Sequence, residues 1–184
     1  MNRSFYLMHP LWGLNRIYQK AMRYIRGLWV SIIFESGNNL QIGKGGVFDC
    51  LNIQFGSNVV IGQGVHIFGR GKLTLGNNVM IGDGTIICIA KEISIGNDTM
   101  IAAQCYITDC NHGMHLGKLM REQPVSIKPT IIGSDVWLGC GCKVLAGANI
   151  KDGTVLGAGT ILDYITGENE IIIPPRDNRS YARR

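Results

Sequence analysis

The sequence predicts an all-β fold, a parallel β-helix of hexapeptide repeats, with a helical segment ahead of it and one long excursion loop. Three blocks of 20 residues begin alike, at Phe55, Leu75 and Ile95, and each continues with Gly and two small polar residues. An aliphatic residue also recurs every six positions, as in the series Ile132, Leu138, Val144, Ile150, Leu156 and Leu162. A period of six is neither that of an α-helix nor that of a simple strand, and it is typical of a solenoid built from short strands and turns.

Residues 1–38 are predicted to form an amphipathic helical segment. Its apolar residues recur at spacings of three and four and share one face: Leu11, Leu14, Tyr18, Ala21, Ile25, Leu28 and Ile32. Arg16, Lys20 and Arg23 lie on the opposite face. Gly13 and Gly27 are expected to bend the segment or divide it into two helices. Such a segment either covers the open first coil or a neighbouring subunit, or it lies on an anionic membrane surface. We favour the cap, and the two interpretations are compatible.

Residues 39–167 are predicted to form the β-helix. Three hexapeptides make one triangular coil, so that about 18 residues climb one inter-strand spacing of ~4.8 Å, and the range holds roughly seven coils. The aliphatic residue of each hexapeptide points inward, and a small residue four positions later fits an inside corner; these are Val59, Val65, Val79, Thr85, Thr99, Cys105, Val136, Cys142, Ala148, Thr154 and Thr160. Each 20-residue block carries two extra residues before Leu75 and Ile95, where we expect a bulge.

Composition and charge exclude several functions. The net charge of +5 is carried by the ends, since residues 1–34 contain no acidic residue and the tail 168–184 ends in arginines. The prism therefore lacks the continuous basic face that nucleic acid requires. The six cysteines include no CxxC pair, so we expect no metal site and reduced thiols. Residues 1–34 show no secretory signal pattern. We expect a cytoplasmic protein, peripheral on the inner face of the plasma membrane if the helix contacts lipid.

The repeat is interrupted once, and we expect the functional site there, because excursions from a rigid scaffold commonly carry function. After Ile107 come Asn111 and His112, a loop over residues 113–129 follows, and the hexapeptides restart at Thr130. Two of the four histidines lie in this interruption.

The residues on both sides of the loop resemble those of the hexapeptide-repeat acetyltransferases. The run Asp109-Cys110-Asn111-His112, the loop, and the run PTIIGSDVWLG over residues 129–139 are similar to the galactoside, maltose and xenobiotic O-acetyltransferases and to sugar O-acetyltransferases of surface-polysaccharide clusters. The likeness covers roughly residues 75–162. It implies a left-handed β-helix and an acetyl-CoA-dependent O-acetyltransferase that acts on a sugar hydroxyl in the biosynthesis of O-antigen, capsule or exopolysaccharide.

The resemblance also implies two catalytic groups. His112 matches the general base that takes the proton of the acceptor hydroxyl, a task suited to imidazole. The backbone N–H of Cys140 matches the donor that stabilises the oxyanion. His115 is the less favoured base. For Asp109 we prefer the capping of a turn to the orientation of the histidine.

Further positions match the coenzyme and acceptor sites of the family. Trp137, Gly139, Cys140 and the turn at Ala158 match a coenzyme groove between two prisms, which implies a homotrimer. The candidates for acceptor contacts are Asn111, His115 and Arg121.

The sequence departs from the family in its last coil, where residues 163–166 replace a Thr-Lys-Asp motif. Arg176 and Arg179 are therefore candidates for contacts to the coenzyme phosphates. Two alternative functions are an N-acetyltransferase of an amino-sugar nucleotide and a non-catalytic β-helix scaffold subunit. The first often carries an N-terminal nucleotide-binding domain, for which residues 1–38 are too short. The second would have lost the histidine, the loop and the tryptophan motif, which this chain keeps.

Overall fold

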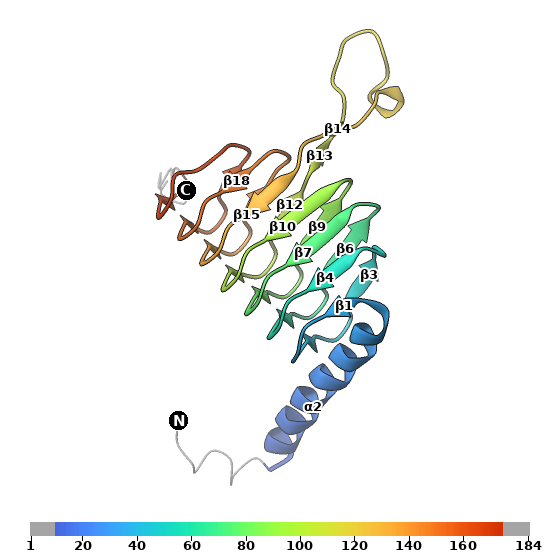
Figure 1. Cartoon of the computed structure of the whole chain (residues 1–184), viewed down its shortest axis with the longest axis vertical. Helices are drawn as coiled ribbons and strands as arrows, with labels where there is room; N and C mark the ends of the chain where they lie inside the picture. Colours follow the sequence, from blue (N-terminus) through green and yellow to red (C-terminus); the bar gives the residue numbers. More distant parts are fainter. Residues whose placement is uncertain (1–9, 175–184) are drawn as a thin grey trace, which may run out of the picture.

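Three parallel sheets form the faces of a triangular prism (Figure 1). The computed structural model describes residues 10–174. Sheet A consists of β1 (Glu35–Ser36), β4 (Ile53–Phe55), β7 (Lys72–Leu75), β10 (Glu92–Ile95), β15 (Thr130–Ile132) and β18 (Asn149–Ile150). Sheet B consists of β2 (Gln41–Ile42), β5 (Val60–Ile61), β8 (Met80–Ile81), β11 (Met100–Ile101), β16 (Trp137–Leu138), β19 (Val155–Leu156) and β21 (Ile171–Ile172). Sheet C consists of β3 (Val47–Asp49), β6 (His66–Gly69), β9 (Ile86–Ile89), β12 (Tyr106–Thr108), β17 (Lys143–Val144) and β20 (Ile161–Leu162).

Equivalent residues of successive coils stack directly on one another inside the prism. In sheet A the parallel register aligns five buried residues: Phe55, Leu75, Ile95, Ile132 and Ile150. The small residues predicted at the inside corners are buried as well, from Val59 to Thr160. The parallel β-helix with an aliphatic core is thus confirmed, and burial of this apolar ladder is what favours the coil over an extended chain.

A ladder of polar side chains holds the corner between sheets A and B. Asn39, Asn58, Asn78 and Asp98 occupy this corner in successive coils, each with φ between 57° and 62°. Asn and Asp tolerate this left-handed backbone better than other residues with a side chain. Each amide donates to the side-chain oxygen one coil later, over 3.0, 3.0 and 2.7 Å. The corner is therefore fixed from coil to coil.

Two residues separate the strands at the corner between sheets C and A in the 20-residue blocks, where the extra length was expected. β6 and β7 have four residues each, and only Arg70 and Gly71 lie between them. Both backbone N–H groups donate to the Ile89 carbonyl, over 3.0 and 3.1 Å. Two successive residues of one coil thus oppose a single carbonyl of the next, as in a β-bulge.

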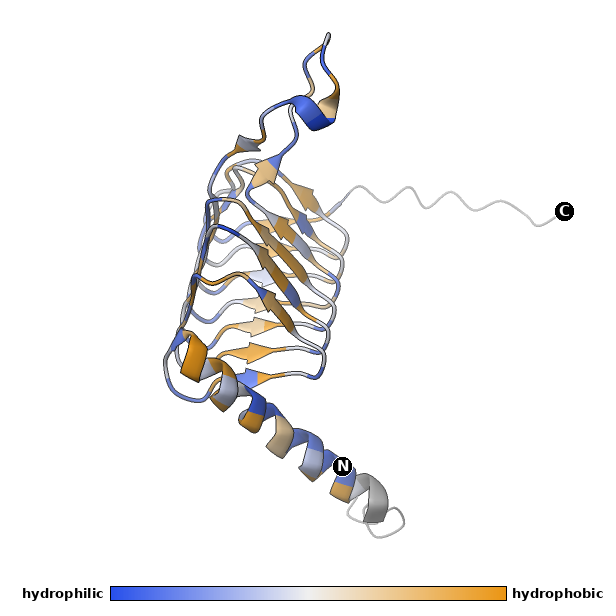
Figure 2. Cartoon of the chain, turned by 90° about the vertical axis from the view of Figure 1, so that its right-hand side faces the viewer, coloured by the Kyte–Doolittle hydropathy of each residue, from blue (hydrophilic) through white to orange (hydrophobic). Residues whose placement is uncertain are grey.

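Residues Pro10–Ile33 form one continuous helix, α2. The expected break at Gly13 or Gly27 does not occur. Gly27 is buried, and a Cβ at this position would overlap the Leu40 carbonyl, so close approach to the first coil explains this glycine. The helix contacts β2 and β1, while its N-terminal part extends beyond the prism (Figures 1 and 2). Within residues 10–174 no helix is sufficiently long and apolar to cross a membrane.

The excursion leaves the corner between sheets C and A. Its base is an antiparallel pair of short strands, β13 (Cys110–Asn111) and β14 (Ser126–Ile127), and it contains one 3-10 turn, η1 (Met120–Glu122). The loop projects away from the prism (Figure 1).

Candidate active site

Asp109 anchors the start of the excursion. Its side chain is fully buried, and its carboxylate accepts the backbone N–H groups of Ala90, Lys91 and Glu92, each over 2.7 Å. These three donors form the corner of the preceding coil. Asp109 therefore caps a turn, as preferred from the sequence. Its main-chain carbonyl accepts the Lys128 N–H at 2.9 Å, which closes the neck of the loop.

His112 lies three residues after this anchor. Asn111 pairs with Ser126 across the neck, and His112 is the next residue. Both side chains are exposed. Within residues 10–174 no side chain or main-chain group is hydrogen bonded to the His112 imidazole. The ring is thus placed by the neck of the loop and is open to a partner from outside the chain.

Gln123 organises the loop from within, and no pattern in the sequence points to this residue. It is 7% exposed, while both of its neighbours are exposed. Its amide bonds to the main chain of His115 and of Lys118. His115 and Arg121, the two candidate acceptor contacts on the loop, keep exposed side chains on this internal scaffold.

The predicted coenzyme residues lie on sheet B and on the corner between sheets B and C. Trp137 faces outward from β16, in register with Met100 and Val155, and is 50% exposed. The Gly139 N–H donates to the Leu156 carbonyl at 2.7 Å. Cys140 and Ala158 are exposed at the same corner in successive coils, joined by a bond of 2.9 Å from the Gly159 N–H to the Cys140 carbonyl.

The Cys140 N–H is available to a ligand. Among the described residues no acceptor is hydrogen bonded to it, whereas the amides on either side are used, Gly139 toward Leu156 and Gly141 toward the Ala103 carbonyl. A backbone N–H held in place by ladder bonds on both sides is the kind of donor that an oxyanion needs. The N–H groups of Ala103 and Ala158, at the equivalent positions of the adjacent coils, likewise bond no acceptor among the described residues. The free N–H is thus a property of this corner, and the choice of Cys140 stays a prediction from the sequence.

Two of the thiols inside this part of the prism, Cys105 and Cys88, are not poised for nucleophilic attack. Hydrogen bonding to Cys105 lowers the pKa of a third thiol, Cys142, to about 7, but that side chain is fully buried in the core. Hydrogen bonding to Cys142, together with burial, raises the pKa of the Cys105 thiol. Burial and the neighbouring Cys110 raise the pKa of the Cys88 thiol. Both groups stay protonated at neutral pH, and the thiolate is the nucleophilic form of cysteine. A covalent acyl-cysteine intermediate at Cys88 or Cys105 is therefore disfavoured, and direct attack of the acceptor on an acyl donor is favoured instead.

One prism does not bring the two predicted catalytic groups together. His112 lies beyond the corner between sheets C and A, and Cys140 lies at the corner between sheets B and C. Sheet C separates these two corners. The two groups that the sequence predicts to be catalytic therefore belong to two different edges of the prism.

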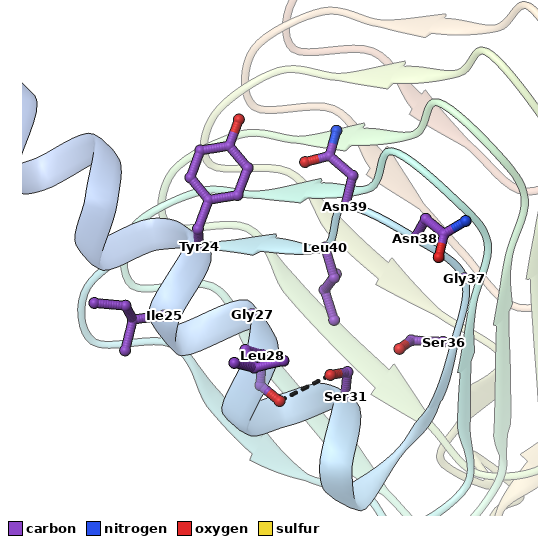
Figure 3. A pocket seen from close by; sticks show the side chains of 10 residues that line it. All are labelled: Tyr24, Ile25, Gly27, Leu28, Ser31, Ser36, Gly37, Asn38, Asn39 and Leu40. Atoms are coloured by element: carbon purple, nitrogen blue, oxygen red, sulfur yellow. Dashed lines mark hydrogen bonds between the residues drawn. The ribbon is translucent and has the colours of Figure 1, made fainter.

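A recess of about 550 Å³ lies elsewhere, between α2 and the first coil (Figure 3). Its lining includes Tyr24, Leu28, Ser31 and Leu40. None of the predicted site residues lines it. Arg176 and Arg179, the predicted phosphate contacts, lie outside the described residues.

Known proteins are similar to this chain in sequence and in fold. The family described as bacterial transferase hexapeptide (six repeats) matches residues 129–163. WbbJ of Escherichia coli, named as an O-acetyl transferase of lipopolysaccharide biosynthesis, is 34% identical over 143 residues, which cover 71% of this chain and 72% of WbbJ. A single-residue mutant of AntD, an N-acyltransferase from Bacillus cereus in complex with dTDP-4-amino-4,6-dideoxyglucose and coenzyme A, has a TM-score of 0.60 at 20% identity, over 86% of this chain and 89% of AntD. At that identity the likeness to AntD shows the fold.

Proposed function

The chain belongs to the hexapeptide-repeat acyltransferases, and we propose that it transfers an acetyl group from acetyl-CoA to a sugar hydroxyl in the biosynthesis of a surface polysaccharide. The sequence identity to WbbJ supports the reaction and the acceptor class. The division of the site between two edges of the prism is the observation that carries the mechanism. Since the donor is a coenzyme A thioester, we place the reaction in the cytoplasm.

The chemistry needs one base and one oxyanion donor. His112 takes the proton of the acceptor hydroxyl as its oxygen attacks the thioester carbon. The oxyanion of the tetrahedral intermediate accepts the Cys140 N–H. The intermediate then collapses with cleavage of the carbon–sulfur bond, and the departing thiolate receives the proton from His112. The products are an acetyl ester and free coenzyme A.

The remaining predicted residues hold the two substrates. Trp137, Gly139 and Ala158 line the donor groove, and Arg176 and Arg179 contact its phosphates. Asn111, His115 and Arg121 face the acceptor. All three side chains are exposed. Asn111 belongs to the neck and precedes His112, whereas His115 and Arg121 lie in the loop beyond the neck.

A homotrimer completes the site. A neighbouring prism placed against the corner between sheets B and C brings its own His112 to the Cys140 N–H, and cyclic symmetry makes three such grooves. Two observations support this assembly. Sheet B carries an exposed apolar column through Met80, Met100 and Trp137, and the loop tip carries exposed Met114 and Leu116. Exposed apolar surface of this extent is typical of a subunit contact.

A transfer assay on the purified chain tests the proposal. Release of coenzyme A from acetyl-CoA is measured over a panel of monosaccharides, oligosaccharides and amino-sugar nucleotides. An O-acetyl product is cleaved by mild alkaline hydroxylamine, whereas an N-acetyl product is stable. Stable products would favour the N-acetyltransferase alternative. An absence of transfer over the whole panel would favour the scaffold alternative.

A further inference from the structure

Helix α2 packs against the prism with its polar side. Gly27 lies buried on the Leu40 carbonyl, and the Arg26 Nε donates to the Ile42 carbonyl at 2.8 Å. Arg23 and Val30, on the same side of the helix, are partly buried. A helix that only capped the solenoid would bury its apolar face, since that burial is the main source of its stability. The packing observed here is the reverse.

The apolar face of α2 is left uncovered by the prism, and Ile25 and Leu28 border the open recess beside the first coil. Five of its aliphatic side chains are between 46% and 72% exposed: Leu14, Ile17, Ile25, Leu28 and Ile32. The helix that carries them extends past the prism at its N-terminal part (Figure 2). An apolar stripe of this length on one face of a helix requires a partner.

Two aromatic residues border this face. At about 100° per residue, Tyr24 lies roughly 40° to one side of Leu28 and Trp29 lies roughly 100° to the other. Both rings are exposed. Tyr and Trp have an apolar body and a polar edge, which suits them to the boundary between lipid tails and water.

The charge of the helix is of one sign. Residues 10–33 contain Arg16, Lys20, Arg23 and Arg26 and no acidic residue. A second copy of the helix would bury the apolar face but would offer the basic side chains no acidic partner. An anionic lipid surface accommodates the apolar face and its aromatic borders. The basic side chains lie on the opposite side of the helix, and their positive charge adds a long-range attraction to that surface.

We infer that α2 is a membrane-docking helix, which lies in the plane of an anionic bilayer with Leu14, Ile17, Ile25, Leu28 and Ile32 inserted. The prism sits on the opposite, polar side of the helix, through Gly27 and Arg26. Lipid and solenoid thus contact the two faces of the same helix, and docking leaves the excursion loop free. The inference does not depend on the acyl-transfer reaction.

Vesicle flotation tests it with two matched double variants. Leu14→Glu/Ile17→Glu places two acidic side chains on the apolar face. Asn15→Glu/Gln19→Glu places the same two charges on the polar face, one residue from Leu14 and two residues from Ile17. The full chain is floated with vesicles of phosphatidylcholine alone and of phosphatidylcholine mixed with phosphatidylglycerol. We expect the wild type to float with the mixed vesicles, and the apolar-face variant to bind at least about tenfold more weakly. The polar-face variant should stay within about threefold of the wild type.

The outcomes distinguish a lipid surface from a second copy of the chain as the partner of the apolar face. Size-exclusion chromatography and circular dichroism establish that both variants keep the assembly and fold of the wild type. No flotation of the wild type, or equal loss in both variants, would overturn the inference. So would a change in oligomeric size caused by the apolar-face variant alone, which would assign this face to a second copy of the chain.

Discussion

The side-chain amide of Gln123 pairs with the main chain of His115 as a neighbouring strand would. Its Oε1 accepts the His115 N–H at 2.8 Å, and its Nε2 donates to the His115 carbonyl at 2.9 Å and to the Lys118 carbonyl at 3.0 Å. Beyond the β13–β14 pair at the neck, this side chain joins the two limbs of the excursion. The loop therefore has a shape of its own at a distance from the aliphatic core.

Gln123→Glu tests this joint with an isosteric change. A carboxylate cannot donate to the two carbonyls, and it is left buried beside them. We expect faster proteolysis within residues 113–125 and a loss of about tenfold in kcat/KM, since a displaced loop weakens positioning. The thermal unfolding of the prism should be unchanged. Gln19→Glu, an exposed change of the same kind, is the control, and equal proteolysis in both would contradict the assignment.

His112→Ala should lower kcat by roughly 10²–10⁴, the usual contribution of a positioned acid–base group. The side chain is exposed, so circular dichroism and assembly should match the wild type. His115→Ala is the comparison, with an effect mainly on the KM of the acceptor. Wild-type turnover in His112→Ala together with its loss in His115→Ala would exchange the two roles.

Mixed trimers test whether neighbouring subunits share a site. Ala158→Glu blocks the donor groove of its own subunit with bulk and negative charge at an exposed position. Each of His112→Ala and Ala158→Glu alone should be nearly inactive. Trimers refolded from an equal mixture should recover about a quarter of wild-type activity, because one groove in four pairs an intact histidine with an intact corner. No recovery would place both groups in one subunit.

Asp109→Ala should destabilise the prism near the loop. Three backbone N–H groups lose their buried carboxylate acceptor, and hydrogen bonds to charged groups contribute about 1.5–3 kcal/mol each without being additive. We expect the free energy of unfolding to fall by roughly 3 kcal/mol or more, measured by denaturant titration. Asp163→Ala, an exposed aspartate outside the polar ladder, is the control. A fall no larger than that of the control would show that the three bonds contribute little.

Deletion of residues 176–184 should raise the KM for acetyl-CoA about tenfold, the value of one ordered Arg–phosphate contact. The KM for the acceptor should stay nearly constant. The effect should be smaller for the acetyl derivative of dephospho-coenzyme A if the 3′-phosphate is the partner. An unchanged KM for acetyl-CoA would show that Arg176 and Arg179 do not contact the coenzyme phosphates.

The sequence by itself determined the solenoid and most of its core. Ile95, Ile132 and Ile150 recur in a local pattern, and each coil repeats the same short strands and corners, so that period alone indicates which side chains face inward. The motif around His112 and Trp137 likewise indicated the acyltransferase family, because the residues on both sides of the one interruption of the repeat resemble those of known members.

Only the tertiary structure decided which face of α2 meets the prism and how the excursion is held. An amphipathic pattern gives the two faces of a helix without saying which is covered, and here the close approach of Gly27 to Leu40 selects the polar one. Gln123 lies eight residues from His115 in a loop without periodicity, so no pattern links them. The same holds for His112 and Cys140, whose places at two different corners follow from the winding of the coils. These relationships depend on contacts between segments that are distant along the chain, and local chemistry does not encode them.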